Sequence, residues 1–158
     1  MSIEFFDSKR ARRVSGDMNI GGYIYTAGIA GKRFFEALRE GKIIASRCPE
    51  CSSKYLPPRL YCEECFTEIS EYVELEEAGI LWSYTVQWVS GDGERLSKPR
   101  IWGLIKFNDV TGGMIHLIDE VDVDKVYIGM LVEPVFKPVE ERVGSIMDIK
   151  YFKPFEEE

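Results

Sequence analysis

The second half of the chain alternates apolar and polar residues with a period of two. Between positions 82 and 88, aromatic and aliphatic side chains alternate with Ser83, Thr85 and Gln87. This period is typical of a β-strand with one packed face and one polar face. Four further apolar stretches follow, separated by turn-forming residues. The pattern predicts five strands, at positions 82–88, Ile101–Phe107, Met114–Ile118, Val126–Phe136 and Ser145–Phe152.

The connections between these strands are short. Asn108–Gly113, rich in turn-forming residues, is predicted to be the turn of a hairpin between the second and third strands. No long helix is expected after the first strand. Five strands joined in this way fit a closed Greek-key barrel of the oligonucleotide/oligosaccharide-binding type (OB-fold), whereas a sandwich normally needs more strands.

The N-terminal third has a different pattern. An apolar stretch of aromatic and small residues, Tyr23–Gly31, precedes Lys32–Glu40, in which Phe34, Phe35 and Leu38 recur at one-turn spacing. This spacing predicts a short amphipathic helix, ended by the glycine that follows it. The helix either covers the rest of the protein or presents its aromatic side chains to a ligand or a partner.

All the cysteines of the chain fall in two C-x-x-C pairs. Ten residues separate the pairs, and a predicted strand, Lys42–Arg47, leads into the first. Two residues between thiolates allow a tight turn to direct both sulfurs at one ion, and two such turns close a tetrahedral shell. A closed four-thiolate site is structural rather than catalytic. Zinc is the expected metal, with a rubredoxin-like iron site or two disulfides as alternatives. The predicted ligands are Cys48, Cys51, Cys62 and Cys65.

The charges divide unevenly along the chain. Residues 1–45 carry a net charge of +3, residues 46–66 of 0 and residues 67–158 of −10, which sum to the −7 of the whole chain. Nucleic-acid affinity depends largely on basic side chains that neutralise phosphates, so the acidic barrel half disfavours this class of ligand. The first residues lack the pattern of a secretory signal, and no apolar run is long enough for a membrane span. We expect a cytoplasmic protein.

Signals of catalysis are weak. His116 is the single histidine, and it lies within a predicted strand between apolar neighbours, which is typical of a structural side chain. No nucleophile elbow, phosphate-binding loop or dinucleotide fingerprint is present. Arg59 follows two prolines between the cysteine pairs and could bind a phosphate or a carboxylate, although a salt bridge to a nearby glutamate is the plainer interpretation. The residues therefore indicate a binding or adaptor protein without catalytic residues.

The expected fold is mainly β, with three consecutive parts. An N-terminal arm and helix occupy residues 1–42, a rubredoxin-like zinc ribbon residues 43–68, and a five-stranded OB-fold barrel residues 69–158. At 158 residues, the chain is long enough for one substantial core and a small module that a metal holds together.

Several short motifs occur in a characteristic order. They are Phe34-Phe35-Glu36-Ala37-Leu38, Gly41-Lys42-Ile43, the two cysteine pairs, Pro58-Arg59, Gly79-Ile80-Leu81-x-x-Tyr84-Thr85-Val86, Pro99 and Ile128-Gly129-Met130-x-Val132. This order resembles the acyl-CoA-associated rubredoxin-like zinc ribbon/OB-fold family, long labelled a domain of unknown function. The stretch Tyr25–Gly31 resembles the archaeal branch of that family.

The resemblance implies a function that composition alone does not. In the archaeal branch, it implies a non-catalytic scaffold that joins acetoacetyl-CoA thiolase to 3-hydroxy-3-methylglutaryl-CoA synthase in the mevalonate route to isoprenoid lipids. A coenzyme A thioester would then be a shared ligand of the complex. Candidate contacts to coenzyme A or to a partner are Arg59, Phe34, Phe35 and Tyr25. A nucleic-acid-binding zinc-ribbon/OB module is the alternative.

Overall fold

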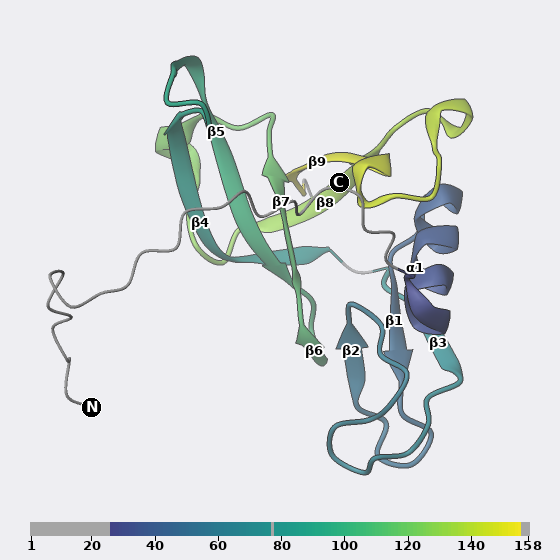
Figure 1. The fold of residues 1–158 in the computed structure, drawn as a ribbon. Helices are drawn as coiled ribbons and strands as arrows, with labels where there is room; N and C mark the ends of the chain where they lie inside the picture. Colours follow the sequence, from purple (N-terminus) through teal and green to yellow (C-terminus); the bar gives the residue numbers. More distant parts are fainter. Residues whose placement is uncertain (1–25, 77, 156–158) are drawn as a thin grey trace, which may run out of the picture.

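Two sheets organise the computed structural model, which describes residues 26–76 and 78–155. The larger sheet is a closed barrel with strand order β4-β5-β7-β9-β8 (Figure 1). The predicted mainly β fold with a five-stranded barrel is confirmed. The bounds of the barrel strands are β4 Gly79–Val89, β5 Arg95–Lys106, β7 Met114–Ile118, β8 Leu131–Phe136 and β9 Ile149–Pro154.

Alternation within the barrel strands fills its interior. β5 pairs antiparallel with both β4 and β7, and the parallel pair Ile118–Phe152 between β7 and β9 helps to close the barrel. Where Gly103 faces the interior, an added Cβ would lie 2.4 Å from the Leu81 side chain, so a larger residue would not fit. Close packing of this kind leaves little tolerance for added volume.

Four barrel strands differ from their predicted bounds, and β4 extends beyond the predicted 82–88 at both ends. β8 begins at Leu131 rather than at 126, because Gly129 adopts a left-handed conformation with φ of 95° that interrupts the extended run. β9 begins at Ile149 rather than at 145, because the residues before it form a short 3-10 helix, η3 (Ile146–Asp148). β5 begins at Arg95, well before the predicted start at Ile101, so the β4–β5 hairpin is longer than expected.

A smaller sheet has strand order β3-β1-β2-β6 and contains the cysteine-rich segment. β1 and β2 belong to that segment and β3 follows it directly, whereas β6 comes from the part of the chain that connects β5 to β7 of the barrel. Asn108–Gly113 connects the antiparallel strands β5 and β7, as predicted for a hairpin, but part of it also forms β6, which pairs in parallel with β2 (Figure 1). The bounds are β1 Ile44–Arg47, β2 Lys54–Leu56, β3 Glu71–Glu74 and β6 Val110–Gly112.

Glycine makes this junction between the two sheets possible. Gly112 has φ of 94°, and a Cβ at this position would lie 2.1 Å from the carbonyl oxygen of Leu56. The next residue, Gly113, donates its N–H to the same oxygen at 2.9 Å. Only a residue without a side chain permits this approach and this φ.

Helix α1 (Gly28–Glu40) packs beside β1 (Figure 1). It begins before the predicted start at Lys32, and its buried residues include Ala30 in the added turn. Gly41 ends the helix as predicted for a C-terminal glycine, with φ of 84° and N–H groups of Gly41 and Lys42 donating to the last helical carbonyls. Within the described residues, no helix is long and apolar enough to cross a membrane.

The connection between β8 and β9 contacts α1 through η3 and is held by one buried carboxylate. Asp148 accepts hydrogen bonds from the N–H groups of Val143, Gly144 and Ser145 at 3.1, 2.7 and 3.1 Å. Burial opposes ionisation of Asp148, but these N–H groups outweigh it and hold its pKa below the usual value. Two other 3-10 helices, η1 (Val123–Lys125) and η2 (Val139–Glu141), lie in loops of the barrel.

Candidate metal centre

The first cysteine pair sits in a tight loop between β1 and β2. The N–H of Cys48 donates to the carbonyl of Ser53 at 2.9 Å, and the N–H of Ser52 donates back to the carbonyl of Cys48 at 3.0 Å. Ser52 adopts a left-handed conformation with φ of 62°. This conformation reverses the chain directly after Cys51 and brings both side chains of the pair to the same side of the loop.

The second cysteine pair repeats the same backbone geometry. The N–H of Cys62 donates to the carbonyl of Thr67 at 2.9 Å, and the N–H of Phe66 donates to the carbonyl of Cys62 at 3.0 Å. Phe66, like its counterpart in the first loop, is left-handed, with φ of 57°. We call these two loops, residues 47–53 and 61–67, the first and second knuckles. Together they direct four sulfurs toward one another.

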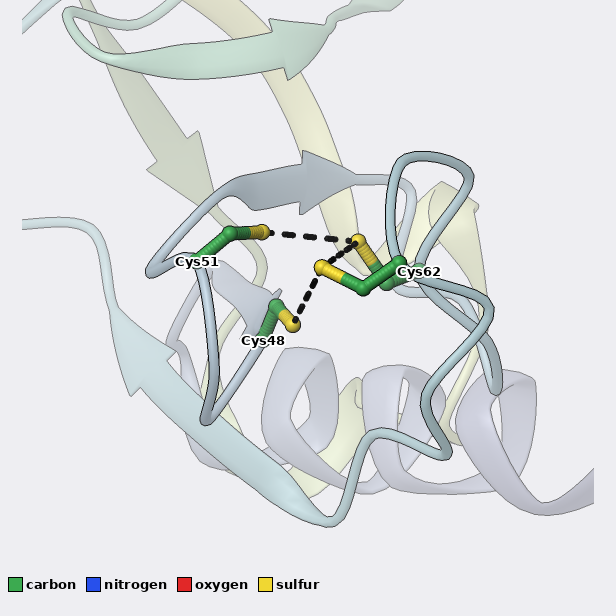
Figure 2. Close-up of side chains that lie close together, drawn as sticks. Cys48, Cys51 and Cys62 are labelled. Carbon is green, nitrogen blue, oxygen red and sulfur yellow. Dashed lines mark hydrogen bonds between the residues drawn. The ribbon is translucent and has the colours of Figure 1, made fainter.

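The sulfur positions match a tetrahedral metal site. All four Sγ atoms lie within 4.8 Å of one another, with separations of 3.8 Å for Cys48–Cys65, 3.6 Å for Cys51–Cys62 and 3.7 Å for Cys62–Cys65. A tetrahedron with zinc–sulfur bonds of about 2.3 Å has edges of about 3.8 Å. A disulfide would need about 2.0 Å. Figure 2 shows the sulfurs of Cys48, Cys51 and Cys62 pointing toward one another.

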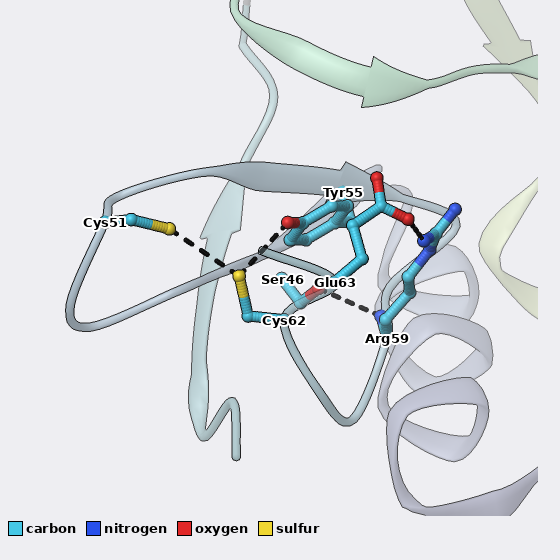
Figure 3. Close-up of polar contacts among 6 residues, drawn as sticks. All are labelled: Ser46, Cys51, Tyr55, Arg59, Cys62 and Glu63. Atoms are coloured by element: carbon cyan, nitrogen blue, oxygen red, sulfur yellow. Dashed lines mark hydrogen bonds and ion pairs between the residues drawn. The ribbon is translucent and has the colours of Figure 1, made fainter. Parts of the chain in front are cut away.

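Tyr55 adds a hydrogen bond to this sulfur cluster. Its hydroxyl lies 3.2 Å from Sγ of Cys62, and both residues are buried (Figure 3). This hydrogen bond lowers the pKa of the Cys62 thiol to about 6 and raises the pKa of Tyr55 to about 12. Both shifts are those of a hydroxyl that donates to a thiolate. The donor set is therefore suited to a soft divalent metal.

Arg59 lies beside the sulfur cluster and is engaged within the chain. Its guanidinium forms an ion pair with Glu63 and lies 5.0 Å from the ring centre of Tyr55 (Figure 3). Its backbone N–H donates to the buried hydroxyl of Ser46 at 2.9 Å. The plainer interpretation of Arg59, a salt bridge to a nearby glutamate, is what the structure contains.

The aromatic candidates of the N-terminal segment have different positions. Phe34 is buried in the main core at 5% exposure, and Phe35 is partly buried against it, with ring centres 5.9 Å apart. The interpretation of this helix as a cover for the fold therefore holds for Phe34. Tyr25 lies outside the described residues.

His116 has the environment predicted for a structural side chain. It is buried, packs edge-on against Phe152 with ring centres 5.8 Å apart, and has Nε2 3.4 Å from the carbonyl of Ile146. Burial lowers the pKa of its imidazole. A neutral histidine enclosed by the barrel core is poorly placed to meet a substrate.

Family models match most of the chain in two consecutive segments. Residues 35–70 match the model described as "ChsH2, rubredoxin-like zinc ribbon domain", and residues 72–137 match "ChsH2, C-terminal OB-fold domain". A curated relative from Methanocaldococcus jannaschii, the "DUF35 domain-containing scaffold protein", is 32% identical over 122 residues, which are 72% of this chain and 82% of the relative. The chain belongs to the DUF35 family.

One solved structure agrees with this DUF35 assignment, and a second shares the fold. A DUF35 protein of unknown function from Sulfolobus solfataricus is 33% identical, with a TM-score of 0.61 over 68% of this chain and 78% of that chain. A structure described as "Ltp2-ChsH2(DUF35) aldolase" has a TM-score of 0.59 over 77% of this chain and 91% of that chain. At 21% identity, the second shows the fold alone.

Sequence reasoning did not identify two features of this DUF35 protein. Tyr55 gives no local signal, because its contact with Cys62 depends on how the two knuckles fold together. The second feature is the apolar outer face of β5. Its signal was available, since Ile101–Phe107 is apolar at almost every position, and a strand apolar on both faces indicates that both faces are covered.

Proposed function

We propose that this chain is a non-catalytic scaffold that bridges acetoacetyl-CoA thiolase and 3-hydroxy-3-methylglutaryl-CoA synthase, so that acetoacetyl-CoA passes from the first enzyme to the second. The observation that carries the proposal is the similarity, over most of both chains, to a relative named a scaffold protein. The motif order described above supports the choice of the two enzymes.

An exposed apolar surface on the barrel supports a role in binding proteins. Register places Trp102 opposite Leu117 and Leu104 opposite Ile115, on the side of the sheet away from the buried Ile101 and Ile105. Ile115 is 70% exposed. Surfaces of this kind are typical of interaction sites. We call it the barrel face and define it by Trp82, Trp102, Leu104, Ile115 and Leu117.

Polar neighbours keep the tryptophans of the barrel face in place. The ammonium of Lys106 lies 4.3 Å from the ring centre of Trp82, which is 56% exposed. Nε1 of Trp102 donates to Oε1 of Gln87 at 2.8 Å. Preoriented aromatic side chains lose little conformational freedom on binding, so they suit an interface. In the proposed complex, the barrel face contacts one enzyme and the zinc ribbon with α1 contacts the other.

We assign Cys48, Cys51, Cys62 and Cys65 as ligands of a structural zinc ion. Four thiolates complete the preferred shell of zinc and leave no position for water or substrate. The ion would supply folding free energy to the small sheet, whose own buried cluster consists of Tyr55 and Ile69 with three of the cysteines, Cys48, Cys62 and Cys65. Iron would fit the same donors, and metal analysis of the purified protein separates the two.

The benefit of such a bridge is proximity. Condensation of two acetyl-CoA molecules by a thiolase is unfavourable, so rapid removal of acetoacetyl-CoA favours the forward reaction. A scaffold that holds the two enzymes together raises the effective concentration of the intermediate at the second active site. This requires binding surfaces and a rigid body, but no catalytic group in the scaffold.

Reconstitution from purified proteins tests the proposal. The chain is mixed with the thiolase and the synthase of its own organism, and the mixture is separated by size exclusion. We expect one peak that contains all three proteins, and no stable complex of the two enzymes when the chain is left out. Separate elution of the chain from both enzymes would refute the bridging role.

One observation favours a second candidate function, the binding of single-stranded nucleic acid. Arg100, Trp102 and Lys106 lie on the outer side of β5. Aromatic and basic side chains together can bind single-stranded nucleic acid. The acidic charge of the barrel half opposes it. Filter binding with single-stranded DNA and RNA at several salt concentrations tests this candidate, because phosphate contacts produce a steep salt dependence.

A further inference from the structure

Phe66 combines a backbone conformation that lowers the stability of the isolated chain with a side chain that adds almost nothing to it. It adopts the left-handed backbone conformation, with φ of 57°, which crowds the Cβ of every residue except glycine. Its side chain is 81% exposed, so the large apolar ring gains almost nothing from burial. Within this chain, neither the backbone nor the packing favours phenylalanine at this position.

The first knuckle shows what the same backbone position requires. Ser52 has φ of 62° and makes the same N–H contact to the first cysteine of its pair as Phe66 makes in the second knuckle. The contact uses backbone atoms alone, so a small residue suffices. The buried cluster around the sulfurs does not include Phe66. A strained residue that brings no local benefit indicates a role outside the chain.

The surroundings of Phe66 define the chemistry of what it would contact. Residues 61–68 contain three glutamates and no basic residue. Glu63 is paired with Arg59, whereas Glu64 and Glu68 are exposed and form no ion pair with any other described residue. A second aromatic residue, Tyr61, is 55% exposed in the same knuckle. The second knuckle therefore combines exposed aromatic side chains with exposed carboxylates.

We propose that Phe66 is an anchor that inserts into an apolar cavity on a partner enzyme, with lysine or arginine side chains of that enzyme around the opening. The proposal rests on the scaffold function and specifies how the ribbon would dock. Insertion would bury the exposed ring and pair Glu64 and Glu68 with opposite charges. A single aromatic side chain in a fitted cavity is a common centre of binding energy.

Two matched substitutions separate this anchor role from a structural one. Phe66→Gly relieves the left-handed strain and removes the ring, and Ser52→Gly relieves the same strain in the first knuckle. Each is expected to raise the thermal midpoint of the isolated protein by about 2–4 °C. Zinc content, measured by mass spectrometry, is expected to be the same as in the wild type for both variants.

Binding to the purified thiolase and synthase is then measured by calorimetry for the three forms of the chain. We expect Phe66→Gly to weaken binding to one of the enzymes at least about 10-fold and Ser52→Gly to leave both affinities unchanged. Equal affinities for the wild type and Phe66→Gly would overturn the anchor while leaving the scaffold intact. A wild-type chain that binds neither enzyme would overturn both.

Two further results would also contradict the anchor. A lower thermal midpoint for Phe66→Gly would mean that the ring stabilises the chain itself. A wild-type dimer that dissociates on the Phe66→Gly substitution, detected by light scattering, would assign the ring to contact between two copies. Molecular mass and thermal midpoint are measured on the same samples as the affinities. The three measurements together therefore distinguish the outcomes.

Discussion

The junction between the ribbon sheet and the barrel is expected to depend on the absence of a side chain at Gly112. In Gly112→Ala, the new Cβ would lie 2.1 Å from the carbonyl oxygen of Leu56. No flexible side chain can move aside, because the atom it meets belongs to the backbone. We therefore expect β6 to separate from β2 while the barrel itself remains closed.

The structure sets the size of the effect. A left-handed alanine costs about 1 kcal/mol relative to glycine. Separation of β6 from β2 also breaks the hydrogen bond from Gly113 to Leu56 and the adjoining bonds of the parallel pair, each worth about 1 kcal/mol. The expected loss of unfolding free energy is about 3 kcal/mol. Gly129→Ala is the control, since Gly129 has nearly the same φ, 95°, but nothing within 4 Å of the added Cβ.

Urea unfolding followed by tryptophan fluorescence measures both variants, and amide hydrogen exchange of Gly113 reports on the junction. We expect Gly129→Ala to lose about 1 kcal/mol and to keep slow exchange at Gly113. Gly112→Ala is expected to lose about 3 kcal/mol and to exchange rapidly there. If the two variants lose the same free energy, the close approach to Leu56 does not limit this position, and the reasoning is wrong.

Three other perturbations have defined outcomes. Asp148→Asn is expected to cost about 2 kcal/mol at pH 7. Because folding lowers the pKa of Asp148, this difference should shrink as the pH falls below about 4, and a constant difference in urea unfolding would contradict it. Chelation of the metal should abolish the protection of β1 and β2 from amide hydrogen exchange and leave that of β4 unchanged. An equal loss of protection in both sheets would contradict this. Arg59→Ala should change stability by less than about 1 kcal/mol, since its ion pair with Glu63 is half exposed; a larger loss in thermal unfolding would show a structural role.

Local sequence patterns sufficed for the parts of the fold that depend on neighbouring residues. The cysteine spacing specified the two knuckles, alternation located β4, and apolar stretches between turn-forming residues located the other four barrel strands. One missed feature also had a local signal: Ser145 and Asp148 have the spacing of a capping box, which forms here and delays the start of β9. The helix start was missed because Gly28 and Gly31, in the added turn, have low helix propensity, whereas burial of Ala30 stabilises that turn in the folded protein.

Pairing between distant segments left no such signal. β6 has three residues, and its partner in the smaller sheet, β2, belongs to the cysteine-rich segment far away in the sequence. Because a tight turn cannot connect two parallel strands, no turn signal in the sequence indicates that these two segments pair. The sequence also does not predict that the side chain of Phe66 is exposed, since a phenylalanine after a cysteine pair could equally be buried. These features depend on the assembled fold.

The pairing of β6 with β2 has a consequence for biosynthesis. Residues of the ribbon leave the ribosome before those of the barrel and can bind metal before the barrel is complete. One edge of β2 nevertheless stays unpaired until the β5–β7 hairpin has been synthesised. An uncovered strand edge invites pairing with other chains. β2 is short, only Lys54–Leu56, and begins with a lysine, both of which discourage such pairing. The nascent ribbon is thus protected from aggregation during the interval in which its final strand is still being synthesised.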